Sequence, residues 1–329
     1  MSNKLFVSPS PHVNGDQTSK RIMCDVIIAL SPALLVSALY FGWRSLLTCF
    51  VAVLSCVIFE YLIRRFLLGD RYGIKGDLSS VVTGLLLGFN LPSDISWWIV
   101  VIGALVAIAI AKMSFGGLGK NPFNPALVAR VFLLIAYPVQ MTNFADVNTL
   151  VVDGFTGATP LTKVKGALLN GSQGIFDVAD LSFQDMIFGS IPGSLGEVCS
   201  LMLILGGFYL LYKSVISWHI PVAVLGSMSF VALCYGYGCG YDYFDAAGFA
   251  LFHILAGGAL LGAIYMATDY TTSPMTGRGM LLFGVGIGAI TMFIRLWGSY
   301  PEGMSFAILI MNSCVPLINK YVKPNRFGA

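Results

Sequence analysis

Long apolar runs recur along the chain, and they constrain its fold more than any other feature. Most are close to the roughly 20 residues that an α-helix needs to cross the hydrocarbon core of a bilayer. Charged residues make up only 11% of the 329 residues, whereas about a quarter is usual in a soluble domain. A bilayer core offers no water to unpaired backbone groups, so such runs are expected to be helical. The sequence therefore predicts an all-α polytopic membrane protein rather than a soluble domain with a large core.

Ten apolar segments follow one another along the chain, and each predicts a transmembrane helix. The third is short and ends at Asn90-Leu91-Pro92, and the eighth ends in a polar run from Thr268 to Pro274. Proline and polar residues at such places shorten or interrupt a helix. The predicted segments are 22–42, 45–63, 78–91, 95–111, 123–138, 195–212, 218–235, 247–267, 279–294 and 304–319.

The basic residues predict how these segments are oriented. If the N-terminus is cytoplasmic, most Lys and Arg residues between the segments lie inside, as is usual for membrane proteins. Arg44, Lys163, Lys165 and Arg295 are then assigned to the outside. We expect a multi-pass protein of the bacterial inner membrane with both termini in the cytoplasm. Its parts are a cytoplasmic N-terminal segment (1–21), a first five-helix repeat (22–138), an outer, periplasmic loop (139–194), a second five-helix repeat (195–319) and a cytoplasmic tail (320–329).

The two groups of five segments are alike in layout, which predicts an internal repeat. Residues 95–138 and 279–319 each have the pattern of a helix, a glycine-containing polar turn and a second helix. Because five is an odd number of spans, the second copy is expected to be inverted relative to the first. Inverted repeats place short or interrupted helices at a central functional site.

The loop between the two groups contains a short stretch suited to modification. Residues 153–160 have the sequence Asp-Gly-Phe-Thr-Gly-Ala-Thr-Pro. The small residues at 157–158 leave room for another surface to approach the backbone. Pro160 disfavours a helical conformation at Thr159, so we expect an extended, water-facing segment that presents the Thr159 side chain. A threonine hydroxyl is a poor nucleophile unless another group activates it, so its modification would need a separate enzyme. An ordinary surface turn is the alternative.

The string Asp-x-x-Thr-Gly-Ala-Thr resembles the acceptor motif of bacterial flavin transferases. Those enzymes transfer FMN from FAD to the last threonine, through a phosphoester, on the outer side of the membrane. The resemblance implies covalent FMN on Thr159, with Thr156 and Thr162 as rival acceptors. The accompanying cofactor-binding residues would be Asp153, Gly154, Thr156, Gly157 and Ala158.

Residues from about 20 to 322 resemble the RnfD/NqrB membrane flavoprotein family. The resemblance also rests on Asn121-Pro122-Phe123-Asn124-Pro125-Ala126 with Arg130, and on Met266-Ala267-Thr268-Asp269-Tyr270 followed by Ser273-Pro274. About 21 residues precede the first apolar segment, which is more similar to RnfD than to NqrB, whose N-terminal extension is longer. The family fold is a ten-helix inverted repeat similar to urea transporters, in agreement with the segments above.

This resemblance implies a role in an Rnf-type complex, which couples electron transfer between ferredoxin and NAD to movement of Na⁺ or H⁺. The chain would be a translocase subunit that relays electrons through FMN, with no catalytic side chain of its own. Its partners would be RnfA, RnfB, RnfC, RnfE and RnfG, and a flavin transferase would be needed for maturation. Some family members also hold a second, noncovalent flavin such as riboflavin. The alternatives are an NqrB-like quinone-reductase subunit and a urea-transporter-like solute or ion channel.

A few ionisable residues lie within or at the ends of the apolar segments, where they are costly and usually functional. Glu60, Asp77 and Asp269 are candidates for an ion pathway. The alternatives are that Glu60 pairs with Arg64 one turn along the helix, and that the two aspartates are interfacial caps. Arg130 can hold a flavin phosphate or carbonyl, or neutralise a carboxylate. The seven cysteines form no Cys-x-x-Cys pair and predict no metal site.

Overall fold

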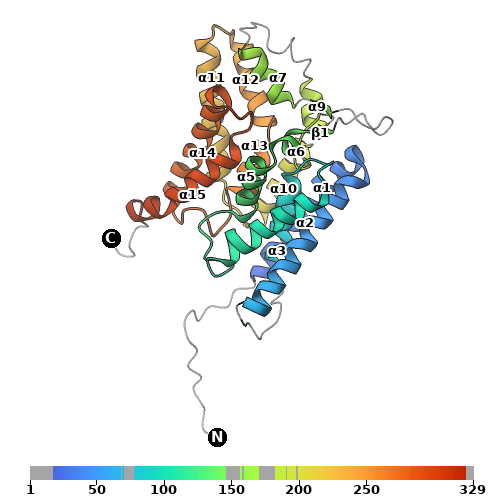
Figure 1. Cartoon of the computed structure of the whole chain (residues 1–329). Coiled ribbons are helices and arrows are strands. Elements are labelled where there is room, and N and C mark those ends of the chain that lie inside the picture. Colours follow the sequence, from blue (N-terminus) through green and yellow to red (C-terminus); the bar gives the residue numbers. More distant parts are fainter. Residues whose placement is uncertain are drawn as a thin grey trace.

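The computed structural model describes residues 18–67, 69, 78–145, 156–157, 159–169, 182–189, 191–197 and 199–323. These residues form a bundle of helices with one very short β-ladder (Figure 1). Every predicted apolar segment falls on described helical residues, although the segment 247–267 is divided between two helices, so the all-helical class of the core is confirmed.

The first half of the chain supplies helices α1 to α6. Gly42 alone separates α1 from α2, and its φ of 70° allows the sharp turn between them. α2 and α4 both continue into a π-helical stretch, η1 and η2. The bounds are α1 Ser19–Phe41, α2 Trp43–Leu62, η1 Ile63–Leu67, α3 Ser79–Phe89, α4 Trp97–Leu105, η2 Val106–Met113, α5 Pro125–Ala136 and α6 Pro138–Thr142.

A short ladder and two helices lie in the loop between the two halves. Strand β1 (Phe144–Ala145) pairs antiparallel with β2 (Thr156–Gly157). The all-α prediction missed this ladder because two residues are too few for an alternating pattern to emerge. Helix α7 (Pro160–Leu169) follows β2 closely, and α9 (Phe183–Phe188) lies further along the loop.

The second half contains a helix that the sequence did not predict to be broken. Residues 247–267 were expected to form one helix, but Tyr243–Leu255 and Ala259–Met266 are inclined by 63° to each other. Gly257 and Gly258 lie between them with φ of 66° and 62°, a conformation that other residues rarely adopt. The bounds of this half are α10 Ser200–Tyr212, α11 His219–Gly238, α12 Tyr243–Leu255, α13 Ala259–Leu261, η3 Gly262–Met266, α14 Gly277–Trp297 and α15 Met304–Tyr321.

Several helices have the length and composition of membrane spans. Among the described residues, four helices qualify, and the bent pair formed by α12 with α13–η3 is a fifth candidate. The other apolar helices, α3, α4–η2, α5 and α10, are shorter. Many large apolar side chains, including Leu39, Phe66 and Phe230, lie exposed on the outside of the bundle, which suits contact with lipid. These are the features of a multi-pass membrane protein. The four single helices are Ser19–Phe41, Trp43–Leu67, His219–Gly238 and Gly277–Trp297.

The helices pack in the same pattern in both halves. α2 packs against α3 and α4, and α11 packs against α12 and α14. The halves meet where α1 contacts α10 and where α5 contacts α15 (Figure 1). Glycines let these helices approach closely, as is common in membrane bundles. A Cβ atom on Gly84 of α3 would lie 2.6 Å from the Cα atom of Val53, and one on Gly288 of α14 would lie 2.6 Å from the carbonyl oxygen of Val224.

Candidate functional site

Thr159 lies directly before α7 and caps its first turn. The backbone N–H of Thr162 donates to Thr159 Oγ1 over 3.3 Å, and the two threonine hydroxyls are 2.8 Å apart. Helix α7 begins at Pro160, a first-turn position that suits proline, whereas the sequence predicted an extended segment and no helix here. The Thr159 side chain is only 5% exposed, however, whereas a water-facing side chain was expected. Capping turns the hydroxyl toward α7, and the packing of α7 against the second half of the chain buries the side chain.

Helix α7 is held firmly against the second half of the chain. The ammonium group of Lys165 donates to the carbonyl oxygens of Gly298 and Tyr300, over 2.5 and 2.9 Å. Burial on this surface lowers the pKa of Lys165. Leu161 is buried, and its Cδ1 atom lies 2.1 Å from where a Cβ on Gly257 would be, so only glycine fits there. These contacts fix Thr159 beside the break between α12 and α13.

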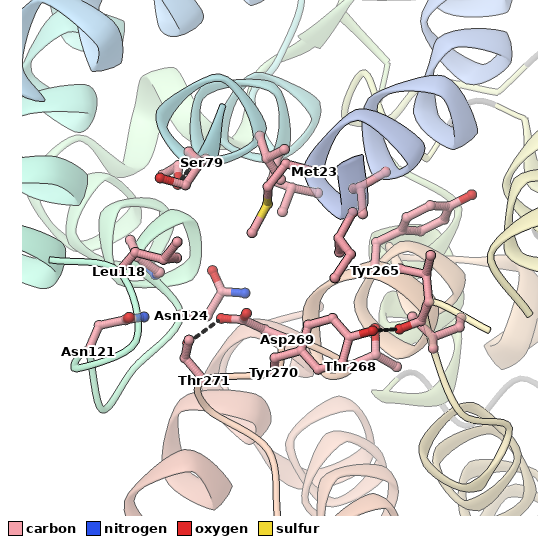
Figure 2. Close-up of a pocket in the computed structure, with 18 of the residues that line it drawn as sticks. Met23, Ser79, Leu118, Asn121, Asn124, Tyr265, Thr268, Asp269, Tyr270 and Thr271 are labelled. Atoms are coloured by element: carbon pink, nitrogen blue, oxygen red, sulfur yellow. Dashed lines mark hydrogen bonds between the residues drawn. The ribbon is translucent and has the colours of Figure 1, made fainter. Parts of the chain in front are cut away.

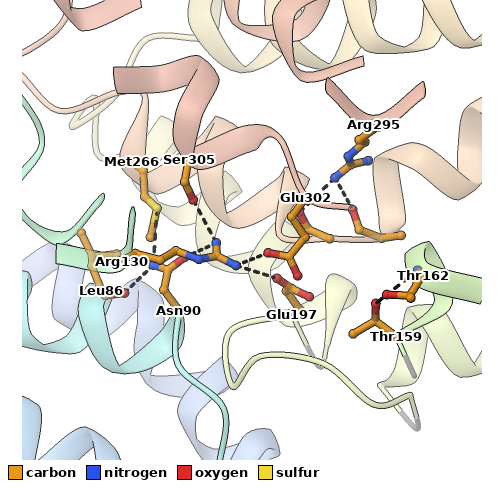
Figure 3. A network of polar contacts seen from close by, with 12 residues as sticks. Leu86, Asn90, Arg130, Thr159, Thr162, Glu197, Met266, Arg295, Glu302 and Ser305 are labelled. Atoms are coloured by element: carbon orange, nitrogen blue, oxygen red, sulfur yellow. Dashed lines mark hydrogen bonds and ion pairs between the residues drawn. The ribbon is translucent and has the colours of Figure 1, made fainter. Parts of the chain in front are cut away.

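Arg130 of α5 is the centre of a buried polar network (Figure 3). Its guanidinium donates to Asn90 Oδ1 over 2.7 Å and to Ser305 Oγ over 3.1 Å. It also forms a close ion pair with Glu302 and lies 3.8 Å from Glu197 Oε1. Arg130 thus neutralises carboxylates, which is one of the two roles the sequence suggested for it. The network joins the end of α3, α5 and the residues that precede α10 and α15.

Arg295 is a second buried cation, and it lies at the break between α12 and α13. The sequence assigned it to a water-facing turn, but it lies in the last turn of α14 and is 2% exposed. It donates to the carbonyl oxygens of His253, Ala256 and Gly257, over 2.6, 2.9 and 3.0 Å. The break after α12 leaves these carbonyls without helical partners, so the guanidinium satisfies them inside the bundle.

Glu60 belongs to a separate buried cluster near the start of α3. It pairs with Arg64, as the sequence suggested, and also accepts from Lys112 Nζ over 2.7 Å. Lys112, at the end of η2, is 2% exposed and donates to Ser79 Oγ over 2.7 Å. Glu60 is therefore neutralised by two cations. Among the described residues, no group of three His, Cys, Asp or Glu side chains can hold a metal ion.

A cavity of about 90 Å³ lies between α1, α3, α10 and η3, and Asp269 faces it (Figure 2). The Asp269 carboxylate accepts from Thr271 Oγ1 over 3.0 Å. Asn124 caps α5 and donates to the carbonyl oxygen of Met266 over 3.2 Å, which links the Asn-Pro motif to η3. The walls are mainly apolar, and the polar lining includes Ser79, Lys112, Asn121, Asn124 and Asp269.

The structure does not describe several of the predicted site residues. Asp77, Asp153, Gly154 and Ala158 lie outside the described residues, and Thr156 and Gly157 are described only as the backbone of β2. The ion-pathway role of Asp77 and the arrangement of the acceptor motif around Thr159 therefore stay predictions.

A family model described as the NQR2, RnfD, RnfE family matches residues 6–328. This chain belongs to that family. The D subunit of a proton-translocating ferredoxin:NAD(+) oxidoreductase complex from Clostridium ljungdahlii is 39% identical, over 99% of this chain and 97% of that protein. The D subunit of the Na(+)-translocating ferredoxin:NAD(+) oxidoreductase complex from Acetobacterium woodii is 41% identical, over 98% of this chain and 95% of that protein. The D subunit of an ion-translocating oxidoreductase complex from Vibrio atlanticus is 37% identical, over 98% of this chain and 99% of that protein.

In this member of the NQR2, RnfD, RnfE family, sequence analysis missed Lys112, Glu197 and Glu302. Lys112 directly follows the apolar segment 95–111, and it was counted among the basic residues between segments that predict the orientation. Glu197 lies inside the predicted segment 195–212, and an ionisable residue there was a signal of function in its own right. Glu302 lies in a polar turn, and nothing in its surrounding sequence indicates that it pairs with Arg130.

Proposed function

We propose that the chain is the membrane subunit of an Rnf-type complex that relays electrons through FMN esterified to Thr159. The complex would couple electron transfer between ferredoxin and NAD to translocation of Na⁺ or H⁺. The observation that carries the proposal is the Asp153–Thr159 acceptor motif in a chain similar over nearly its whole length to the D subunits of ion-translocating complexes. The names of two relatives specify different ions, so similarity leaves the coupling ion open.

The surroundings of Thr159 suit a phosphoester. Thr159 caps α7, so a phosphate on its oxygen would lie at the N-terminus of a ten-residue helix. Unpaired N–H groups and the helix dipole stabilise negative charge at that position. The N–H of Thr162, which now donates to Thr159 Oγ1, is one donor for such a phosphate. Thr159 is only 5% exposed, so neighbouring side chains must move to admit the rest of the group while the phosphate stays at the N-terminus of α7.

The protein's own part in this function is to hold and orient the group. Thr159 provides the covalent oxygen, and Lys165 and Leu161 fix α7 against the residues around Gly257 and Gly298. FMN supplies the electron-transfer chemistry when bound, and the protein sets its position and its electrostatic environment. The other Rnf subunits, RnfA, RnfB, RnfC, RnfE and RnfG, are the proposed donors and acceptors, and a flavin transferase is the proposed maturation enzyme.

Mass spectrometry of peptides from native membranes tests this proposal directly. We expect the peptide containing Thr159 to be heavier than its sequence mass by FMN less one water, with fragmentation that assigns the addition to Thr159. The neighbouring peptide of α9 serves as an unmodified control. A Thr159 peptide found only at its sequence mass would reject the redox role and favour the solute-channel alternative.

The proposed arrangement is two inverted five-helix repeats of urea-transporter type, in the inner membrane, with both termini cytoplasmic. The equivalent packing of α2 on α3 and α4, and of α11 on α12 and α14, supports the repeat. The broken helix at Gly257–Gly258 supports it too, because interrupted helices are typical of such folds.

Cysteine labelling tests the orientation. In a variant whose seven native cysteines are replaced, Asn170→Cys is expected to react with a membrane-impermeant maleimide in intact cells, because the loop 139–194 would face outward. Lys4→Cys, in the predicted cytoplasmic segment, is expected to react only after permeabilisation. The reverse pattern of labelling would overturn the orientation.

The cavity beside Asp269 is the proposed site for the second, noncovalent flavin. At about 90 Å³ it is smaller than the roughly 300 Å³ of the smallest typical ligand pockets, so its walls must move apart for the ring system to enter. Its apolar walls suit an aromatic ring system, and the amides of Asn121 and Asn124 can bond to ring nitrogen and carbonyl groups. Between Asp269 and Glu60, we propose Asp269 as the ion-pathway residue. Asp269 faces the cavity, whereas Glu60 is already neutralised by Lys112 and Arg64.

A quinone-reductase role like that of NqrB remains the second candidate, since the matching family model includes NQR2. The acceptor used by the purified complex separates the two roles. Reduction of NAD by reduced ferredoxin would support the Rnf role, and reduction of quinone by NADH would support the other.

A further inference from the structure

Glu197 is the least well held member of the buried charge network. It is 7% exposed, and its Oε1 atom has no hydrogen-bond partner among the described residues. Its nearest cationic contact, from Oε1 to a guanidinium nitrogen of Arg130, is 3.8 Å long, which is too far for a hydrogen bond. Arg130 gives its close contact to Glu302 instead. A buried carboxylate oxygen without a hydrogen bond is costly, and adding a proton to the carboxylate removes that cost.

The charged groups around Glu197 are balanced only when both glutamates are ionised. Arg130 of α5 and Arg295 of α14 supply two positive charges, and Glu197 and Glu302 supply two negative ones. His253 of α12 is also buried here and contacts Arg295. An additional negative charge placed nearby would leave the site with an excess of negative charge in a region of low dielectric. Uptake of one proton by a carboxylate is the simplest way to cancel that excess.

The contacts of α7 bring this network close to Thr159. Leu161, two residues after Thr159, packs against Gly257. On the adjoining residue, Gly258, a Cβ would lie 3.0 Å from the unpartnered Oε1 of Glu197. Lys165 binds the turn that leads to Glu302. Figure 3 shows Glu197 and Glu302 on the side of Arg130 that faces Thr159.

We infer that Glu197 is the proton acceptor coupled to reduction of the redox group on Thr159. The inference rests on the proposed function, since it needs that group. In each step, the group gains one electron from a one-electron donor, such as a flavin or iron–sulfur cluster of a neighbouring subunit, and the donor is oxidised by one electron. One proton from water forms an O–H bond on Glu197, which becomes a neutral carboxylic acid. Reoxidation of the group releases the proton.

Infrared difference spectroscopy of the purified complex, reduced minus oxidised, tests this assignment. We expect a band from a protonated carboxyl group to appear on reduction. Glu197→Gln, which preserves side-chain size, is expected to abolish the band, and Glu197→Asp is expected to retain it at a shifted frequency. Asp94→Asn, which alters a half-exposed ion pair with Arg44, is the control and is expected to leave it unchanged. A band that persists in Glu197→Gln, or is absent from the unsubstituted complex, would overturn the inference.

Redox titration gives a second readout on the same samples. The midpoint potential of the Thr159-linked flavin is expected to change by about 59 mV per pH unit for one proton per electron, and Glu197→Gln is expected to flatten this slope. An unchanged slope in Glu197→Gln would contradict the inference. In-gel flavin fluorescence of each sample shows first whether the covalent group is present. An unsubstituted chain without flavin refutes the proposed function itself. If the chain is fluorescent but Glu197→Gln changes neither the infrared band nor the pH slope of the midpoint potential, only the role of Glu197 is refuted.

Discussion

A Thr159→Ala chain is expected to show no flavin fluorescence on a denaturing gel under ultraviolet light, whereas the unsubstituted chain is expected to fluoresce. Denaturation removes noncovalent flavin, so the remaining signal reports only an ester bond. Alanine has no hydroxyl oxygen to carry the phosphate, and the loss should therefore be complete. The substitution also removes the cap of α7, which costs about 1 kcal/mol. That amount is small enough for the chain to insert and accumulate.

Thr162→Ala is the matched control for this experiment. Its hydroxyl is 2.8 Å from that of Thr159, and the two residues share the first turn of α7. We expect Thr162→Ala to remain fluorescent, because the acceptor oxygen and the backbone N–H donor both stay. Thr156→Ala tests the other rival acceptor. Fluorescence that persists in Thr159→Ala and disappears in either of the other variants would move the attachment to that residue.

The positions of the helices were predictable because they depend on local composition. A run of apolar residues long enough to cross a bilayer identifies a helix without any knowledge of its neighbours. The same reasoning missed the break after α12, since Gly257 and Gly258 were the only local signal and glycine is common in membrane helices. In the structure, Arg295 satisfies the carbonyls at this break from 38 or more residues further along the chain.

The candidate site was predictable only where it depends on neighbouring residues. The helix that begins at Pro160 was not predicted. The acceptor motif follows from adjacent positions in the sequence. The burial of Thr159 does not, because it depends on how α7 docks through Lys165 and Leu161 on residues of the second half. Pairs such as Lys112 with Glu60, or Arg130 with Glu302, join residues 52 and 172 positions apart. No local pattern specifies such pairs.

Replacement of Arg130 by leucine is expected to cause the largest loss of stability. The leucine can fill part of the space, but it leaves Glu302 without its close partner and Asn90 and Ser305 without a donor. Removing one member of a buried ion pair typically costs about 3–5 kcal/mol, because the remaining charge is left uncompensated. We expect a marked drop in the melting temperature of the detergent-solubilised complex, measured by the loss of its monodisperse peak after heating.

Arg44→Leu is the matched control, since Arg44 pairs with Asp94 at 3.0 Å while both side chains are about half exposed. Such exposed pairs contribute about 0–1 kcal/mol.

A double variant distinguishes lost charge compensation from poor packing of the leucine. If the uncompensated Glu302 charge causes the instability, then Arg130→Leu combined with Glu302→Gln should be more stable than Arg130→Leu alone, because the neutral amide can be buried at lower cost. Glu197 would still limit the recovery, since it also loses its nearest cation on α5. Adding Glu197→Gln to the double variant should therefore restore further stability. Equal melting temperatures for the single, double and triple variants would mean that packing around residue 130, rather than charge, determines the stability of this region. In that case Arg130 would not be the residue that holds the two carboxylates in place beneath Thr159.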